Sequence, residues 1–317
     1  MVTTYILRRL LIVAPLLAGL SVILFLMVSY MPGDPIDLMV SPDLGPEQAA
    51  QRRAQLGLDQ PIYVRYANWV VEILQGNIGY SFITRQPVAK MIWERVPATV
   101  LLMGLAMLLA LVIGIPLGIA SALKKGTWTD NIATLVAFGG ISVPNFFLAI
   151  VAIYIFSVKL HWLPSAGMSN PGADFSLMDR ISRLIMPMIV LSFYPLATFM
   201  RYMRSSMLEV IRADYVRTAR AKGLSERVVV YKHALRNALL PVITLLGLQF
   251  RWLFGGSVII ERIYAWPGIG RLMVDSVFSR DNAVVMAIVM ISAIMVIAGN
   301  LMADISYAFV DPRIKYD

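Results

Sequence analysis

Few side chains in this sequence could carry chemistry, and they do not gather into a catalytic group. The 317 residues include no cysteine and only two histidines, His161 and His233. Thiol catalysis and thiolate metal sites are therefore excluded. No Gly-x4-Gly-Lys-Ser/Thr phosphate loop occurs either. We expect no catalytic residue, no metal ligand and no cofactor bound by this chain.

Three polar residues inside apolar runs are candidates for a transport path. Arg251 and Asp304 are opposite charges within such runs, where a charge costs up to about 3 kcal/mol and usually faces a partner or a wet cavity. They could pair with each other, reach the membrane interface, or touch a substrate. Asn145 follows Pro144 and could mark a helix break that lines the path, or satisfy carbonyls freed by the proline.

The elements around these residues are those of a membrane protein. Hydrophobic residues make up 58% of the chain and charged residues 15%, against about 25% charged in soluble domains. Uncharged runs of about 20 residues suffice to span a bilayer. We predict an all-α polytopic protein with six spans: Leu10–Met31, Ala98–Leu123, Ile132–Val158, Leu184–Met200, Leu239–Val258 and Val284–Phe309.

The net charge of +9 sets the orientation of these spans. With the N-terminus inside, the segments 1–9, 124–131, 201–238 and 310–317 are cytoplasmic, and they contain the whole basic excess. The positive-inside rule explains that distribution, so no nucleic-acid partner is needed. Both termini are expected in the cytoplasm. Outside, residues 32–97 include an amphipathic stretch around Tyr63–Leu74 that favours a helix.

The internal segment 201–238 predicts two helices joined by an elbow. Gly223 can adopt the left-handed conformation that ends the first helix, and Ser225 suits the N-cap of the second, with Glu226 in its first turn. One apolar stripe on the first helix comprises Met203, Met207, Val210, Ile211 and Tyr215. Arginines on the other faces leave a second interpretation open, a basic amphipathic helix lying on anionic lipid.

The sequence from Tyr215 to Gly223 resembles the EAA loop of ABC importer permeases. Ala219 and Gly223 match that motif, whereas Arg217 and Thr218 replace its first two residues, a form similar to the peptide and nickel permeases. The resemblance implies docking of this loop into a groove on a cytoplasmic ATPase. The implied coupling residues are Tyr215, Arg217, Thr218, Ala219, Lys222 and Gly223.

Other short motifs, in order along nearly the whole chain, resemble the same subfamily. They include Pro32-Gly33-Asp34-Pro35, Gly79-Tyr80-Ser81, Arg95 with Pro97 and Thr99, Ser142-Val143-Pro144-Asn145-Phe146, Glu261 with Trp266-Pro267-Gly268-Ile269-Gly270, and Asp311-Pro312-Arg313. The resemblance implies an N-terminal transmembrane helix (1–31), an external loop region (32–95), a type-1 permease core (96–309) and a cytoplasmic tail (310–317).

The function implied by the resemblance is transport, without catalysis by this chain. The expected assembly, in a bacterial inner membrane, contains a homologous second permease, two ATPase subunits that hold ATP and Mg, and an external solute-binding protein. Dipeptides or oligopeptides are the expected cargo, with nickel, glutathione and oligosaccharides as alternatives. A stand-alone secondary transporter would need more intramembrane carboxylates than Asp304 alone, and a membrane-embedded enzyme would need paired His or Asp residues inside the spans.

The pair Gly114 and Gly118 in the second predicted span indicates close packing against another helix.

Overall fold

The computed structural model describes residues 2–30, 51, 54, 57, 59–170, 172, 176–249 and 257–310, with only the backbone described at 2–10, 248 and 302–310. The described residues are helical apart from turns, loops and a single β-bridge between Tyr80 and Pro87. The long helices are α1 (Val2–Ser29), α5 (Val88–Leu123), α8 (Leu177–Val210) and α16 (Asn282–Val310).

Shorter helices connect and cover the long ones. They are α4 (Ile62–Leu74), α6 (Trp128–Ser142), α7 (Asn145–Ala152) with the π-helical η1 (Ile153–Lys159), α9 (Asp214–Ala221), α10 (Glu226–Val228) with the π-helical η2 (Val229–Ala234), α11 (Leu235–Ala238), α12 (Leu240–Gln249), α14 (Val258–Ile263) and α15 (Ile269–Phe278). The amphipathic stretch at Tyr63–Leu74 is therefore helical, as predicted.

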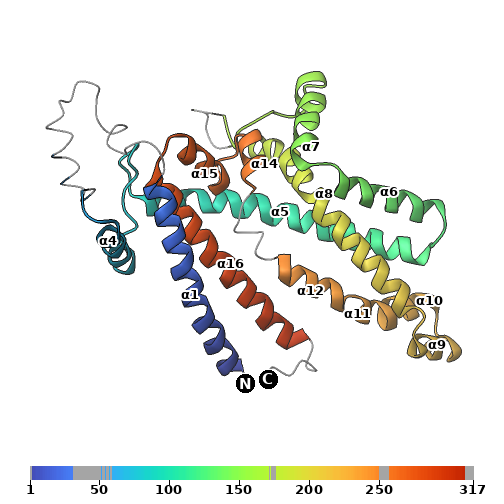
Figure 1. The fold of residues 1–317 in the computed structure, drawn as a ribbon. Coiled ribbons are helices and arrows are strands. Elements are labelled where there is room, and N and C mark those ends of the chain that lie inside the picture. The colour runs from blue at the N-terminus through green and yellow to red at the C-terminus, as the bar shows by residue number, and fades with distance from the viewer. Residues whose placement is uncertain are drawn as a thin grey trace.

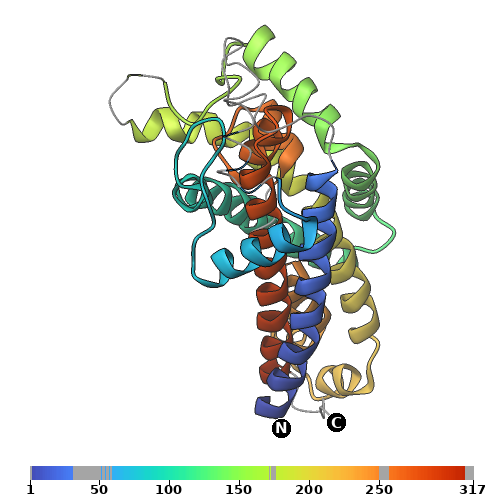
Figure 2. The same cartoon turned by 60° about the vertical axis from the view of Figure 1, so that its left-hand side comes forward.

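The long helices run side by side or cross between two ends of the molecule (Figures 1 and 2). The first turn of α1, the last turn of α16 and the short helix α9 lie at one end, and α14 and α15 lie at the other (Figure 1). α1 and α16 are neighbours in both views and in contact. The side of the membrane that this end of the molecule faces stays a prediction.

Four described helical segments are long and apolar enough to cross a membrane: Leu11–Ser29, Val88–Leu123, Leu177–Val210 and Asn282–Leu301. A fifth crossing results if α6 and the α7–η1 segment count as one span. Six spans are not confirmed, because α12 has 10 residues and the remainder of the predicted span Leu239–Val258 lies largely outside the described residues. Only 11% of the α1 window is buried, so most of this apolar helix faces outward.

The predicted span Ile132–Val158 is not one straight helix, and the helix break considered at Pro144 and Asn145 is present. The chain bends by 102° between Trp128–Ser142 and Asn145–Lys159. Val143 is extended, with φ −92° and ψ 123°, because the residue before a proline is pushed out of the helical region. Pro144 also lacks the N–H group that would continue the hydrogen-bond ladder. Hydropathy alone could not reveal this bend, because the apolar run continues through it.

The helix α8 is much longer than the predicted span Leu184–Met200, and this changes the apolar stripe. α8 passes through Pro187 and Pro195 and ends at Val210, and a turn at 211–213 precedes α9. Met203 and Met207 are buried on α8, whereas Tyr215 lies on α9 and is 43% exposed. The prediction of one continuous stripe was wrong because the turn resets the helical register.

The α5–α8 interface is the most extensive helix contact in the described residues, and small residues permit it. A Cβ atom on Gly114 would lie 2.8 Å from the carbonyl oxygen of Leu196, and one on Gly118 would lie 2.7 Å from that of Met200. These distances are too short for any side chain other than hydrogen. The predicted close packing at Gly114 and Gly118 is confirmed, and α8 is the partner.

Candidate coupling surface

The short helix α9 stands out at one end of the molecule because its two faces have different surroundings (Figure 1). Val216 is fully buried and Ala219 is 6% exposed, in one hydrophobic cluster with Met203 and Met207 of α8 and with the π-helical segment η2. Tyr215, Arg217, Thr218 and Lys222 are exposed. α9 is therefore fixed to the core on one side and free to meet another protein on the other.

Five of the six predicted coupling residues lie on the exposed side of α9 or at its end, and the sixth does not. Ala219 points into the protein's own core, so its small size lets α9 approach α8 and η2 rather than a partner. Tyr215 is oriented by its hydroxyl group, which accepts a hydrogen bond from Asn237 Nδ2 at 2.8 Å. The position of Asp214 in the first turn suits the positive end of the helix dipole.

The elbow after α9 is a Schellman motif centred on Gly223. The N–H group of Leu224 donates to the carbonyl of Ala219 at 3.4 Å, and that of Gly223 donates to the carbonyl of Arg220 at 2.9 Å. Gly223 has φ +73°, which glycine adopts without penalty. A Cβ at this position would meet no atom within 4 Å. Glycine is therefore required for its backbone conformation and not for space.

An exposed ion pair spans the same elbow. Arg220 donates from Nη2 to Glu226 Oε1 at 2.6 Å and from Nε to Oε2 at 3.1 Å. These hydrogen bonds lower the pKa of Glu226. Ser225 occupies the predicted N-cap position, but its side chain makes no capping hydrogen bond. The bidentate contact to Arg220 thus holds the start of α10 where a serine cap was expected.

Behind α9, a buried charge cluster joins three helices of the membrane region. Arg204 of α8 donates to both carboxylate oxygens of Asp130 at the start of α6, at 2.7 and 2.9 Å. Ser121 of α5 and the N–H group of Gly126 donate to the same carboxylate. The Asp130 side chain is 6% exposed and that of Arg204 28%. The charges neutralise each other and fix the α5–α6 corner to α8.

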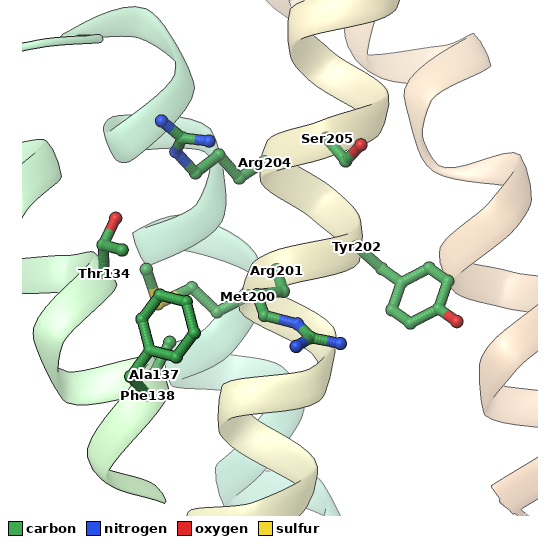
Figure 3. Close-up of a pocket in the computed structure, with 8 residues that line it drawn as sticks. All are labelled: Thr134, Ala137, Phe138, Met200, Arg201, Tyr202, Arg204 and Ser205. Atoms are coloured by element: carbon green, nitrogen blue, oxygen red, sulfur yellow. The ribbon is translucent and has the colours of Figure 1, made fainter. Parts of the chain in front are cut away.

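A cavity of about 400 Å³ lies beside this cluster, between α6 and α8. Thr134 and Phe138 reach it from α6, while Arg204 extends from α8 toward the α5–α6 corner (Figure 3). Tyr202 projects from the other side of α8 (Figure 3). The cavity lies two to three turns of α8 before α9 begins, so a movement of α9 that shifts α8 would also alter its shape.

A second buried carboxylate, Glu261, ties together motif segments that lie far apart in the sequence. Its Oε1 accepts a hydrogen bond from Thr99 Oγ1 at 3.0 Å, and its Oε2 accepts one from the N–H group of Arg271 at 3.1 Å. Thr99 in turn accepts from the N–H group of Ile269 at 2.8 Å. Glu261 has no exposed surface. The indole of Trp266 donates to the carbonyl of Ala98 at 2.8 Å.

This Glu261 cluster explains the spacing of the Trp-Pro-Gly-Ile-Gly segment. A Cβ on Gly270 would lie 2.8 Å from the Cα of Val258, and one on Gly268 would collide with Glu261 and Thr99. Only glycine allows this loop to close over the carboxylate. The sequence motifs were recognised separately, but their mutual contact was not predicted. The cluster locks α14 and α15 to α5 about three turns after its first residue, at Ala98 and Thr99, and lies at the end of the molecule opposite to α9 (Figure 1).

The remaining predicted site residues are only partly described. Asn145 is the first residue of α7, directly after the 102° bend, so the helix break that it could mark is present. Arg251 lies outside the described residues, and so does the side chain of Asp304. Their pairing stays a prediction.

Nearly the whole chain matches known sequence families. Residues 114–316 match the model for a binding-protein-dependent transport system inner membrane component, and residues 1–103 match the model for the N-terminal region of such membrane components. The chain belongs to this permease family. It is accordingly a multi-pass membrane protein that acts in transport and not as a catalytic enzyme.

Several curated relatives of this permease cover nearly the full chain. It is 45% identical over 313 residues to the oligopeptide transport system permease protein AppB of Bacillus subtilis, covering 98% of this chain and 99% of that protein. It is 38% identical over 330 residues to the dipeptide transport system permease protein DppB of Alkalihalophilus pseudofirmus, with 98% and 99% covered. It is 41% identical over 312 residues to the glutathione transport system permease protein GsiC of Salmonella typhimurium, with the same coverage.

A solved structure supports the fold of the permease. One chain from the MetNI methionine ABC transporter in an inward-facing conformation superposes with a TM-score of 0.56, covering 71% of this chain and 99% of that chain. The two sequences are 18% identical over the match, so the likeness concerns the fold alone. The all-helical permease fold expected from the sequence is confirmed.

Proposed function

We propose that this chain is the permease subunit of an ATP-driven importer of dipeptides or oligopeptides. It forms half of the translocation path and works with a homologous second permease, two ATPase subunits and an external solute-binding protein. ATP and Mg are held by the ATPase subunits. Membership of the permease family and the full-length similarity to permeases named for oligopeptide and dipeptide transport support this proposal.

The proposed mechanism rests on how α9 is attached to the rest of the protein. Its outer face is exposed, while Val216 and Ala219 anchor its inner face to α8 and η2. α8 in turn packs closely on α5 at Gly114 and Gly118 and is tied to α6 by Asp130 and Arg204. A force applied to α9 by an ATPase would therefore reach the helices that carry the bend at Pro144. Alternating access follows if that force reorients α6 and α8.

Uptake by the reconstituted assembly tests the proposal. Proteoliposomes that contain this chain, its partner permease and the ATPases are supplied with the solute-binding protein and ATP, and the import of labelled di- and oligopeptides is measured. We expect uptake that requires both ATP and the binding protein. Glutathione, nickel and oligosaccharides serve as competing cargoes. Glutathione is the first to test, because a related permease is named for it. Uptake driven by an ion gradient without ATP would contradict the proposal and favour a secondary transporter.

The proposed orientation places both termini and α9 in the cytoplasm of a bacterial cell, beneath the inner membrane. Reporter fusions check this directly. Fusions at Gly126 and Ser225 should report the inside, and fusions at Gly45 and Ser169 the outside. A signal from outside at Ser225 would exclude contact between α9 and a cytoplasmic ATPase.

A further inference from the structure

We propose that α4 lies in the lipid interface of the bilayer, at the leaflet where α1 ends, with one apolar face inserted among the acyl chains. The helix packs beside α1 and contains no buried residue. The environment of its exposed faces is therefore not provided by the described part of the chain. Three features of the described residues identify lipid as that environment: the distribution of side chains around α4, its depth on α1, and its direction.

Side chains divide α4 into three faces. Tyr66 and Trp69 face α1, where both rings contact the ring of Phe25 at centroid distances of 5.4 and 5.7 Å. Tyr63 and Leu74 share a second face, because eleven residues bring a helix back to within about 20°. They are 71% and 81% exposed. The polar side chains occupy a third face: Asn68 and Glu72, with Arg65 at its border toward α1, where the Arg65 guanidinium lies 5.9 Å from the centroid of the Phe25 ring.

The polar and apolar faces point in opposite directions. Glu72 follows Tyr63 by nine residues, which is about 180° around the helix axis. The contact with α1 lies between these two faces. α4 therefore contacts the membrane span α1 with its side. If its polar face is directed to water, Tyr63 and Leu74 are directed toward the bilayer centre. This is the distribution of an interfacial amphipathic helix.

The depth of α4 is set by its contacts with α1. Ser21 Oγ and Tyr66 Oη are hydrogen-bonded at 2.8 Å, and Phe25 packs against the same tyrosine. Ser21 and Phe25 precede the end of α1 at Ser29 by eight and four residues, which corresponds to about 12 and 6 Å along the helix. Interfacial helices insert their apolar face about 5–10 Å below the headgroup boundary. α4 is therefore held at the depth where lipid chains, and not bulk water, would surround Leu74.

The direction of α4 agrees with this placement. α1 stands upright in both views, whereas α4 is seen nearly end-on in Figure 1 and along its length in Figure 2. The short helix thus crosses α1 and lies in the plane of the membrane. On the side of α1 away from α4, Ile23 and Met27 are 57% and 66% exposed, so α1 itself presents apolar side chains to the same surroundings. Tyrosine and tryptophan are also the side chains that favour the membrane–water boundary.

Single cysteines test the proposal, because the natural chain has none. Leu74→Cys and Asn68→Cys are each introduced into the full transport assembly in lipid nanodiscs and labelled with a nitroxide. The relaxation of each label by oxygen, which partitions into lipid, and by a water-soluble nickel chelate is then measured. Ile23→Cys on α1 gives the lipid reference, and Lys125→Cys in the exposed α5–α6 turn gives the water reference.

We expect the ratio of oxygen to nickel effects at position 74 to approach the value at position 23, and the ratio at 68 to approach the value at 125. Nitroxide lipids labelled near the headgroup should broaden the signal at 74 more than at 68. Equal, water-like ratios at 68 and 74 would overturn the proposal. So would protection of position 74 from both reagents, because that result indicates a protein partner covering this face instead of lipid.

Discussion

Replacing Gly223 should weaken the coupling of α9 to an ATPase by an amount that its backbone conformation sets. Gly223 has φ +73° and its added Cβ would meet no atom within 4 Å. The whole penalty for Gly223→Val is therefore conformational, about 1–2 kcal/mol for a side chain in the left-handed region. If the ATPase binds only the native elbow, this energy reduces its affinity by roughly 5- to 30-fold.

The assay titrates purified ATPase against the permease assembly in nanodiscs, and it also measures ATP hydrolysed per peptide imported. Gly223→Asn is the first control, because asparagine enters the left-handed region more readily than valine, so it should retain most of the affinity. Gly76→Val is the second. Gly76 also has positive φ and open space around its Cβ position, but it follows α4 and lies far from α9.

Equal ATPase affinity for the native assembly and Gly223→Val would refute this reasoning. So would an equal loss for Gly76→Val, since it would show general instability. The alternative in which the basic segment lies on lipid makes a different prediction. In that case, losses would follow the number of positive charges removed, as in Arg217→Gln combined with Lys222→Gln, and would be independent of Gly223.

Three further predictions concern the contacts that hold α9 and the membrane helices. Asp130→Ala should lower the free energy of unfolding by about 3 kcal/mol, because it leaves Arg204 without its buried partner. Arg217→Gln removes one side of an exposed pair and should cost less than about 1 kcal/mol. Thermal unfolding in detergent compares the two variants, and equal losses would contradict the role of the buried pair. Gly118→Ala should destabilise the protein by about 1–3 kcal/mol through overpacking against Met200. Gly104→Ala, whose added Cβ would meet no atom within 4 Å, should stabilise the protein slightly. A gain of stability by both variants in the same melting experiment would contradict the close approach of α5 and α8 at Gly118. Arg220→Gln should reduce stability by less than about 1 kcal/mol at neutral pH. The pKa of Glu226 is lowered from 4.5 in the folded state, so this difference should begin to shrink below pH 4.5 and disappear once the pH has fallen past the lowered pKa; a difference that persists in stronger acid would exclude the ion pair as its origin.

The sequence predicted the elements whose signals are local. Uncharged runs located the long helices, Gly223 located the elbow, and the amphipathic stretch at Tyr63–Leu74 gave α4. These features depend on hydropathy and backbone preference within one segment. The spacing of Gly114 and Gly118 also indicated a close helix contact, but it could not identify α8 as the partner helix.

The contacts between distant segments could not be predicted in this way. Asp130 and Arg204 are 74 residues apart and were counted only as charges of two cytoplasmic segments. Thr99 and Glu261 are 162 residues apart, and no periodicity relates them. The inward orientation of Ala219, which is 6% exposed, was missed because the motif resemblance marks this residue as part of the docking loop without indicating which face of the helix it occupies. Such pairings arise from how the helices fold together, which one segment does not encode.

The most direct test of the central claim is cross-linking between α9 and an ATPase. Thr218→Cys and Ala219→Cys are adjacent substitutions with different surroundings, since Thr218 is exposed and Ala219 is 6% exposed in the core of this chain. Each is combined with a single cysteine in the ATPase groove, and the complete assembly is treated with a short bifunctional reagent. We expect a cross-link from position 218 and none from position 219. No cross-link from 218, or equal cross-linking from both, would contradict it.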